Sequence, residues 1–152
     1  MKLTTKGRYA VMAMADLALH GQADQPVSLG EIAERQEISL SYLEQLFGRL
    51  RRSELVRSVR GPGGGYLLTR PADEIRVSDV ILAVEENMTA TRCRPGSAQG
   101  CLGASGRCVT HDLWDELGRQ IQLFLGSVSL GDVIDGRIGR QAAPAPLQAA
   151  GD

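Results

Sequence analysis

Three cysteines and one histidine in the second half of the chain carry the side chains best suited to bind a metal. They are Cys93, Cys101, Cys108 and His111, with gaps of seven, six and two residues. The last two lie one helical turn apart, so their side chains can meet on one ion. The start of a helix also favours the thiolate form of cysteine, which is the form that binds metal. The set predicts a metal centre with sulfur and nitrogen ligands.

The spacing leaves the kind of metal group open. An odd number of cysteines disfavours a disulfide framework. Structural zinc sites usually contain cysteine pairs separated by roughly two to four residues, whereas a cluster suits longer, glycine-bearing loops. Histidine can replace cysteine as a ligand of a [2Fe-2S] cluster. The pattern favours a cluster over zinc, and the remaining alternative is that the four residues are unrelated, as single cysteines and histidines often are.

Two short helices in the first half predict a helix-turn-helix. Ser28 and Glu31 have capping-box spacing, which starts a helix that ends near Gln36. Ser39 or Ser41 can cap the second helix. Its apolar residues recur three and four apart and are expected to face inward: Leu40, Leu43, Leu46, Phe47 and Leu50. So brief a link between two helices is typical of a DNA-binding motif whose second helix enters the major groove.

The outward face of this second helix is rich in hydrogen-bonding groups. It holds Ser41, Tyr42, Glu44, Gln45, Arg49 and Arg52. Gln45 can read adenine, the serine and tyrosine can bond to phosphates or base edges, and the arginines can pair with phosphates. Phosphates repel Glu44 unless it accepts a hydrogen bond from cytosine, so Glu44→Ala is expected to broaden the set of sites bound. The plainer alternative is an ordinary surface glutamate.

The sequences LVRSVR and YLLTR, on either side of GPGGG, predict two short strands and a glycine turn, which together form a wing. We expect Leu55, Arg57 and Val59 to share one side of the first strand. No Lys-Ser or Lys-Thr follows the glycines, which argues against a nucleotide site. Gly61 can approach DNA through its backbone, and Arg60 can enter the minor groove. A plain tight turn is the alternative.

Charge is unevenly distributed along the 152 residues, whose net charge is only −1. The segment from Phe47 to Arg70 holds one acid, Glu54, and six arginines: Arg49, Arg51, Arg52, Arg57, Arg60 and Arg70. Such a segment suits a surface that faces phosphates, although a solvated basic face would look the same.

The remaining helices support these two regions. A first helix is expected from Lys6 to His20, capped by Thr5, and others from Ser78 to about Asn87 and from Cys108 to about Ser127. We expect Val11, Met12, Ala15 and Leu19 to form the apolar face of the first. The last carries a stripe of Leu113, Trp114, Leu117, Ile121, Phe124, Leu125 and Val128. Leu113, Trp114, Leu117, Ile121 and Phe124 are the candidates for pairing with a second copy, as recognition of palindromic DNA requires.

The predicted architecture is mainly α with a small β-hairpin. A winged helix-turn-helix occupies residues 1–77, a metal-binding loop and dimerisation helices occupy 78–135, and a disordered tail follows at 136–152. No catalytic triad, carboxylate pair or nucleotide fingerprint is present, so an enzyme is not expected. No stretch approaches the roughly 18 uninterrupted apolar residues of a membrane span, and we expect a cytoplasmic protein.

Three parts of the sequence closely resemble the IscR family of bacterial iron-sulfur cluster regulators over roughly residues 1–135. They are LTTKGRYAVMAMADLAL, EIAERQEISLSYLEQLFGRLRRSELVRSVRGPGGGYLL and the Cys93, Cys101, Cys108, His111 set. The resemblance implies a winged-helix homodimer that represses cluster-biogenesis operons when it carries a [2Fe-2S] cluster. It also implies that the four residues are cluster ligands and that Ser41, Tyr42, Glu44, Gln45 and Arg60 face DNA.

The cysteine gaps are longer than is typical of this family, so the loop from Arg94 to Arg107 is expected to hold a cluster in a different shape. Related regulators that sense nitric oxide or iron supply lack the matching histidine, and His111 therefore favours cluster homeostasis. Expected partners are promoter DNA, a second copy and the machinery that delivers clusters. Two other hypotheses stay open: a cluster carrier that does not read DNA, and a regulator stabilised by zinc.

Overall fold

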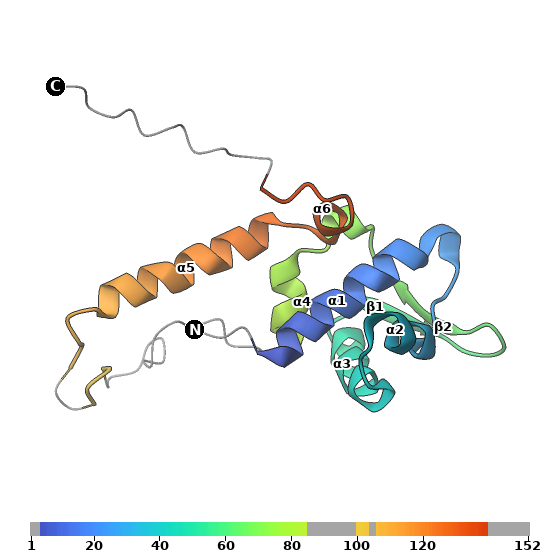
Figure 1. The fold of residues 1–152 in the computed structure, drawn as a ribbon, viewed down its shortest axis with the longest axis horizontal. Helices are drawn as coiled ribbons and strands as arrows, with labels where there is room; N and C mark the ends of the chain where they lie inside the picture. Colours follow the sequence, from blue (N-terminus) through green and yellow to red (C-terminus); the bar gives the residue numbers. More distant parts are fainter. Residues whose placement is uncertain (1–3, 85–99, 104–105, 140–152) are drawn as a thin grey trace, which may run out of the picture.

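The computed structural model describes residues 4–84, 100–103 and 106–139. The helices are α1 (Thr5–His20), α2 (Leu29–Gln36), α3 (Leu40–Arg52), α4 (Val77–Ala83), α5 (His111–Ser127) and α6 (Leu130–Ile134). The strands are β1 (Val56–Val59) and β2 (Gly65–Leu68), and single turns of 3-10 helix lie at η1 (Gln22–Asp24) and η2 (Ala72–Glu74). Figure 1 shows α1 to β2 in winged helix-turn-helix order. The predicted fold class, mainly α with a β-hairpin, is confirmed.

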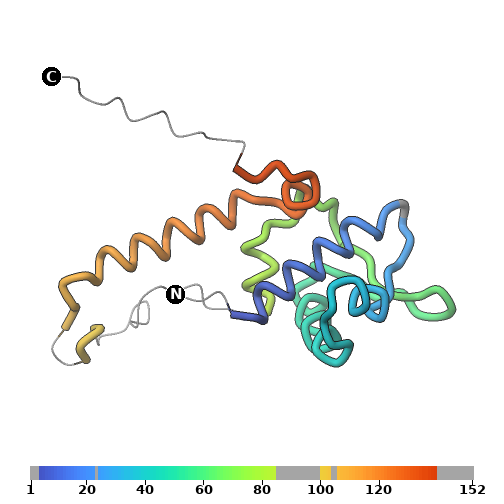
Figure 2. Tube along the Cα trace, in the orientation of Figure 1, coloured from blue at the N-terminus to red at the C-terminus, as the bar shows by residue number. Residues whose placement is uncertain are grey.

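Helix α1 forms the centre of the packed part of the molecule (Figure 2), where it contacts α2, α3, α4, α6 and β2. Its buried apolar side chains are those of Ala10, Ala13, Met14, Leu17 and Ala18. The predicted face was wrong, since Met12 and Leu19 are exposed. The helix is apolar around most of its surface, so spacing alone did not distinguish the two faces. The three alanines decide it, because small side chains let neighbouring helices approach closely.

The helix-turn-helix has the predicted caps. Ser28 Oγ accepts a hydrogen bond from the Glu31 amide (3.2 Å), and the Ser28 amide donates to Glu31 Oε2 (2.8 Å). At α3 the cap is Ser39, whose Oγ accepts from the Tyr42 amide (3.1 Å). The expected inward residues of α3 are buried except Leu40, which is 47% exposed. Leu40 is the first residue of the helix, outside the part of α3 that the core covers.

A buried carboxylate joins α2 to α1. Asp16 accepts hydrogen bonds from Nε and Nη2 of Arg35 and from Nε2 of Gln36, with shortest distances of 2.8 Å to each residue. Burial alone would raise the pKa of Asp16, but the bonds from Arg35 and Gln36 outweigh it and lower this pKa. The charged form of Asp16 thus fixes the first helix of the DNA-binding motif against the core.

The hairpin is held against the loop that precedes α2. Val56 pairs with Leu68 and Val59 with Gly65 in antiparallel register, and the Val27 and Tyr66 backbones exchange two hydrogen bonds (3.0 and 2.8 Å). A Cβ atom on Gly65 would lie 2.3 Å from the Val27 carbonyl oxygen, so this approach needs glycine. The wing is therefore anchored in the core.

The strand does not alternate as expected. Leu55 and Val56 are both buried, and Arg57 is exposed. Leu55 lies before β1 begins, so its direction is set by the turn that follows α3 and not by the pleat of the strand.

Of the later helices, α4 and α6 pack against α1, whereas most of α5 does not (Figure 1). The Val77 amide donates to the Val128 carbonyl and the Leu130 amide to the Ile75 carbonyl (2.9 Å each), which holds α6 beside η2 and α4. Helix α4 begins one residue before the predicted Ser78, and its predicted end lies outside the described residues. Helix α5 projects away from the packed part (Figure 1). None of the described helices is long and apolar enough to cross a membrane.

Candidate DNA interface and metal centre

The predicted DNA-facing residues of α3 divide into exposed and packed ones. Ser41, Glu44 and Gln45 are exposed. Ser41 Oγ lies 3.2 Å from Ser39 Oγ, so the helix cap also holds the first exposed hydroxyl. Tyr42 is half-buried, and its ring meets the Tyr9 ring edge-on, with 5.9 Å between centroids. The exposed three form a polar patch on the first two turns of α3, with Tyr42 at its border.

The two arginines predicted to pair with phosphates are both bonded within the protein. Arg49 is half-buried, and its Nη1 donates to the carbonyl oxygen of Val84 (3.1 Å), the C-cap of α4. Arg52 is exposed, and its Nε donates to the Gly48 carbonyl in the preceding turn (3.2 Å). Arg49 thus joins α3 to α4, whereas Arg52 stays on the surface.

The wing ends in a tight turn that presents Arg60. The Gly64 amide donates to the Gly61 carbonyl (2.9 Å), and Gly61 and Gly63 have positive φ angles of 101° and 72°. Arg60 and Gly61 are exposed beside this turn. The hairpin tip projects beyond the helices (Figure 1), so its backbone and the arginine are accessible to a large partner.

The structure brings two of the four predicted metal ligands together. Cys101 Sγ lies 3.0 Å from Nδ1 of His111, and His111 is 8% exposed as the first residue of α5. Sulfur and ring nitrogen are the donors that zinc and iron-sulfur clusters use in proteins. This pair therefore fits the ligand chemistry of the predicted group.

Of the other two predicted ligands, one lies beside a different side chain and one is outside the described residues. Cys108 Sγ lies 3.7 Å from Oγ1 of Thr110, and Cys93 lies outside the described residues. Within the described ranges no three Cys, His, Asp or Glu side chains gather as a metal site. Helix α5 begins at His111 and not at Cys108, so the two residues are not one turn apart within this helix, as the sequence had predicted.

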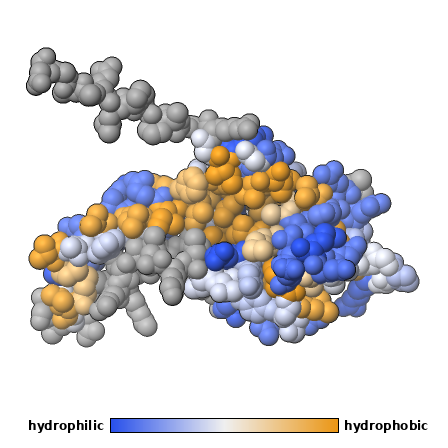
Figure 3. Space-filling view, viewed as in Figure 1, coloured by the Kyte–Doolittle hydropathy of each residue, from blue (hydrophilic) through white to orange (hydrophobic). Residues whose placement is uncertain are grey.

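Helix α5 carries an exposed apolar stripe. Leu113, Trp114, Leu117 and Phe124 are exposed, and Ile121 is half-buried. Figure 3 shows apolar side chains gathered along α5 and continuing to where this helix meets the rest of the molecule. The stripe begins two residues after His111, so the Cys101–His111 pair adjoins it.

The sequence-based prediction gave no specific role to three arginines, Arg51, Arg57 and Arg70, which line a pocket between α3 and the hairpin. The excess of arginine between Phe47 and Arg70 was the one sign of them. It could not tell which arginines lie together.

The helix-turn-helix, the wing and the polar face of α3 define a winged-helix transcription regulator. The sequence pattern of the Rrf2 family, described as "Iron-dependent Transcriptional regulator", matches residues 3–136. The chain belongs to the Rrf2 family and is not an enzyme.

Individual relatives, compared by sequence and by structure, support the same family assignment. HTH-type transcriptional regulator IscR of Xenorhabdus nematophila is 59% identical over 134 residues, which are 88% of this chain and 79% of that protein. The structure of T. potens IscR matches with a TM-score of 0.70 and 39% identity, over 95% of this chain and 94% of that one. The structure of CymR, the global cysteine regulator of B. subtilis, matches with a TM-score of 0.73 and 31% identity, over 90% of this chain and 98% of that one. The predicted resemblance to the IscR family is confirmed.

Proposed function

We propose that this regulator is a cytoplasmic, homodimeric repressor that controls iron-sulfur cluster biogenesis genes by sensing a [2Fe-2S] cluster. The observation that carries the proposal is the Cys101–His111 pair, with 3.0 Å between Sγ and Nδ1, at the start of the helix that carries the exposed apolar stripe. The iron dependence in the family description and the identity to regulators named IscR support it.

The proposed ligands are Cys93, Cys101, Cys108 and His111. Cys101 and Cys108 are half-buried and His111 is buried, so the protein limits the access of water to the ligands. A bound cluster would signal that iron and sulfide are available. Three thiolates and one imidazole suit mixed ligation of [2Fe-2S], with clusters received from the delivery machinery.

The proposed DNA interface combines α3 and the wing. Gln45 reads adenine, Glu44 selects against unsuitable sites, and Ser41 and Tyr42 bond to phosphates or base edges. Arg60 enters the minor groove beside the backbone of Gly61. Arg52 pairs with phosphate, and Arg49 acts by holding α3 against α4.

The apolar stripe of α5 is the proposed dimer interface. Leu113, Trp114, Leu117, Ile121 and Phe124 would pack against the same residues of a second copy, because a two-fold dimer uses one surface twice. Two recognition helices at a fixed spacing then match a palindromic operator.

Anaerobic purification followed by a visible spectrum and iron, sulfide and zinc analysis tests the sensor part. Charge-transfer absorption with iron and sulfide supports a cluster, whereas a colourless protein that contains zinc contradicts it. The His111→Cys variant should lose its cluster more slowly than the parent, because thiolate replaces a labile histidine ligand. An equal rate of loss would remove that role of His111.

Selection of duplexes from a random pool tests the DNA part. We expect one palindromic motif for the parent and a broader set of sites for Glu44→Ala. Binding without sequence preference would instead favour the cluster carrier. Comparison of protein with and without cluster on the selected motif then tests whether the cluster controls repression.

A further inference from the structure

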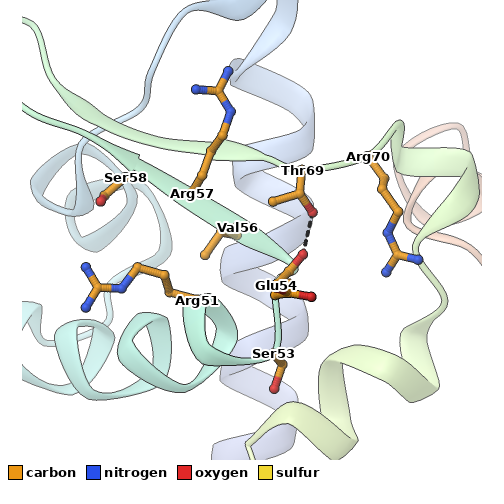
Figure 4. Close-up of a pocket in the computed structure, with 8 residues that line it drawn as sticks. All are labelled: Arg51, Ser53, Glu54, Val56, Arg57, Ser58, Thr69 and Arg70. Carbon is orange, nitrogen blue, oxygen red and sulfur yellow. Dashed lines mark hydrogen bonds between the residues drawn. The ribbon is translucent and has the colours of Figure 1, made fainter.

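A basic pocket lies between the C-terminal end of α3 and the hairpin (Figure 4). Its volume is about 890 Å³, and it is lined by Arg51, Ser53, Glu54, Val56, Arg57, Ser58, Thr69 and Arg70. The hydrogen bond from Thr69 Oγ1 to the Glu54 carbonyl (2.5 Å) ties the turn after α3 to the end of the hairpin. Both walls of the pocket therefore belong to the winged helix-turn-helix of residues 5–70, the winged module.

The three arginines that line this pocket have no carboxylate partner among the described residues. Arg51, Arg57 and Arg70 are all exposed, and among the described residues none of the three forms an ion pair. By contrast, Arg35 and Arg119 pair with carboxylates. One acid, Glu54, lines the pocket, so the lining has a net positive charge that the protein does not neutralise. An anionic partner would complete it.

The directions of the arginines indicate what kind of anion. Figure 4 shows the side chains of Arg51, Arg57 and Arg70 spreading in different directions around Val56. A small ion is held best by donors that converge on it. Spread guanidinium groups suit separate charges along a polymer, and the phosphates of a nucleic-acid strand are such charges.

The location of the pocket fits a particular strand. Arg51 lies seven residues after Glu44, so the two share one face of α3. A recognition helix in the major groove and a wing in the adjacent minor groove have one sugar-phosphate backbone between them. This backbone must cross the space between α3 and the hairpin, which form the two walls of the pocket.

We propose that Arg51, Arg57 and Arg70 bind phosphates of the DNA strand that separates the two grooves. The inference rests on the proposed binding of DNA by α3 and the wing. These arginines contribute affinity without sequence preference, because phosphates are the same at every base pair. Glu54 weakens the contact through repulsion and so limits binding to random DNA.

The test measures affinity against salt concentration by fluorescence anisotropy, with a selected operator and a scrambled duplex of equal length. Each phosphate contact that is lost should reduce the slope of log K against log salt by about 0.9. We expect Arg51→Gln, Arg57→Gln and Arg70→Gln each to weaken binding to both duplexes by the same factor and to lower the slope. The triple variant should show the combined loss of affinity and of slope. Glu54→Gln should strengthen binding to both duplexes. The matched control is Arg119→Gln, which removes an exposed arginine from α5. It should change neither the affinity for the two duplexes nor the slope.

Each result of this test is decisive. Slopes equal to that of the parent in all three arginine variants would overturn the proposal, and so would saturable binding of inorganic phosphate that Arg51→Gln abolishes without changing the slope. If the parent shows no preference for the operator, the proposed function fails, but the slopes still decide whether the pocket binds DNA. Circular dichroism of each variant confirms that it is folded.

Discussion

The winged module and α5 place their apolar side chains in opposite environments. In the module, Met14 and Leu17 of α1 and Leu43 and Phe47 of α3 have no exposed surface. On α5, Leu113 is 61% and Phe124 is 53% exposed. Large contiguous patches of exposed apolar surface commonly mark interaction sites. The core of the module thus lies within one chain, whereas the apolar stripe of α5 is exposed and is the surface that the proposed dimer would cover.

The candidate DNA interface and the Cys101–His111 pair also differ in how the rest of the structure holds them. The polar face of α3 and the wing tip are positioned by caps, by the Asp16 bonds and by the pairing of Val27 with Tyr66. The Cys101–His111 pair lies at the far end of the projecting α5, at the opposite end of the molecule from the wing (Figure 1). In the proposed sensor, the effect of a cluster at this pair must therefore pass along α5 or through a second copy to reach DNA.

Breaking the α5 stripe should have the largest effect. We expect Phe124→Glu to raise the dissociation constant of the dimer by about 1000-fold, because a residue worth about 2 kcal/mol occurs twice in a two-fold interface. Sedimentation equilibrium measures this change. Leu19→Glu, at an exposed leucine at the end of α1, is the control and should leave assembly unchanged. A Phe124→Glu protein as dimeric as the parent would contradict this role of α5.

Removing the charge of Asp16 tests how the module is held together. Asp16→Asn should lower the free energy of unfolding at neutral pH by about 2 to 3 kcal/mol, because Arg35 loses a charged hydrogen-bond acceptor. Since folding lowers the pKa of Asp16, its contribution is present above the ordinary value of 3.8 and is lost as pH falls through the lowered one. Urea unfolding at a series of pH values should show a weaker acid dependence in the variant.

The control for this prediction is Asp24→Asn, at an exposed acid in η1. Its acid dependence should equal that of the parent. If Asp16→Asn also unfolds with the parent's pH dependence, the buried ion pair does not stabilise the module.

Gly65→Ala tests the anchoring of the wing. The added methyl group would lie 2.3 Å from the Val27 carbonyl, so the hairpin must shift, at a cost of about 2 kcal/mol in the free energy of unfolding. Amide exchange at Val27 and Tyr66 should become faster. Gly30→Ala, whose Cβ has its nearest neighbour at 3.8 Å, should cause no such loss. Equal exchange in both variants would show that the wing does not depend on this contact.

Arg49→Gln should have the smallest effect. It probes the contact between α3 of the winged module and the end of α4. Loss of the hydrogen bond to the Val84 carbonyl should cost about 1 kcal/mol and loosen the last turn of α4, as hydrogen exchange can measure. Arg52→Gln removes a bond within α3 and should leave α4 unchanged. If α4 is equally protected in both variants, Arg49 does not join α3 to α4.

Local features of the sequence predicted much of the fold and the exposure of several residues of the candidate DNA interface. The Ser28–Glu31 box, the serine cap of α3 and the glycine turn depend on contacts between residues at most four positions apart, so their spacing is sufficient evidence. These contacts place Gln45 and Arg60 on an exposed helix and an exposed turn.

Tertiary structure decided what spacing could not. It selected the alanine face of α1, turned Arg49 toward Val84, and brought Cys101 to His111 while leaving Cys108 beside Thr110. Each outcome depends on which distant surface a side chain meets, and residues three or four apart carry no record of that. The sequence alone thus determined the elements and their caps, whereas packing between elements determined which side chains come together at each site.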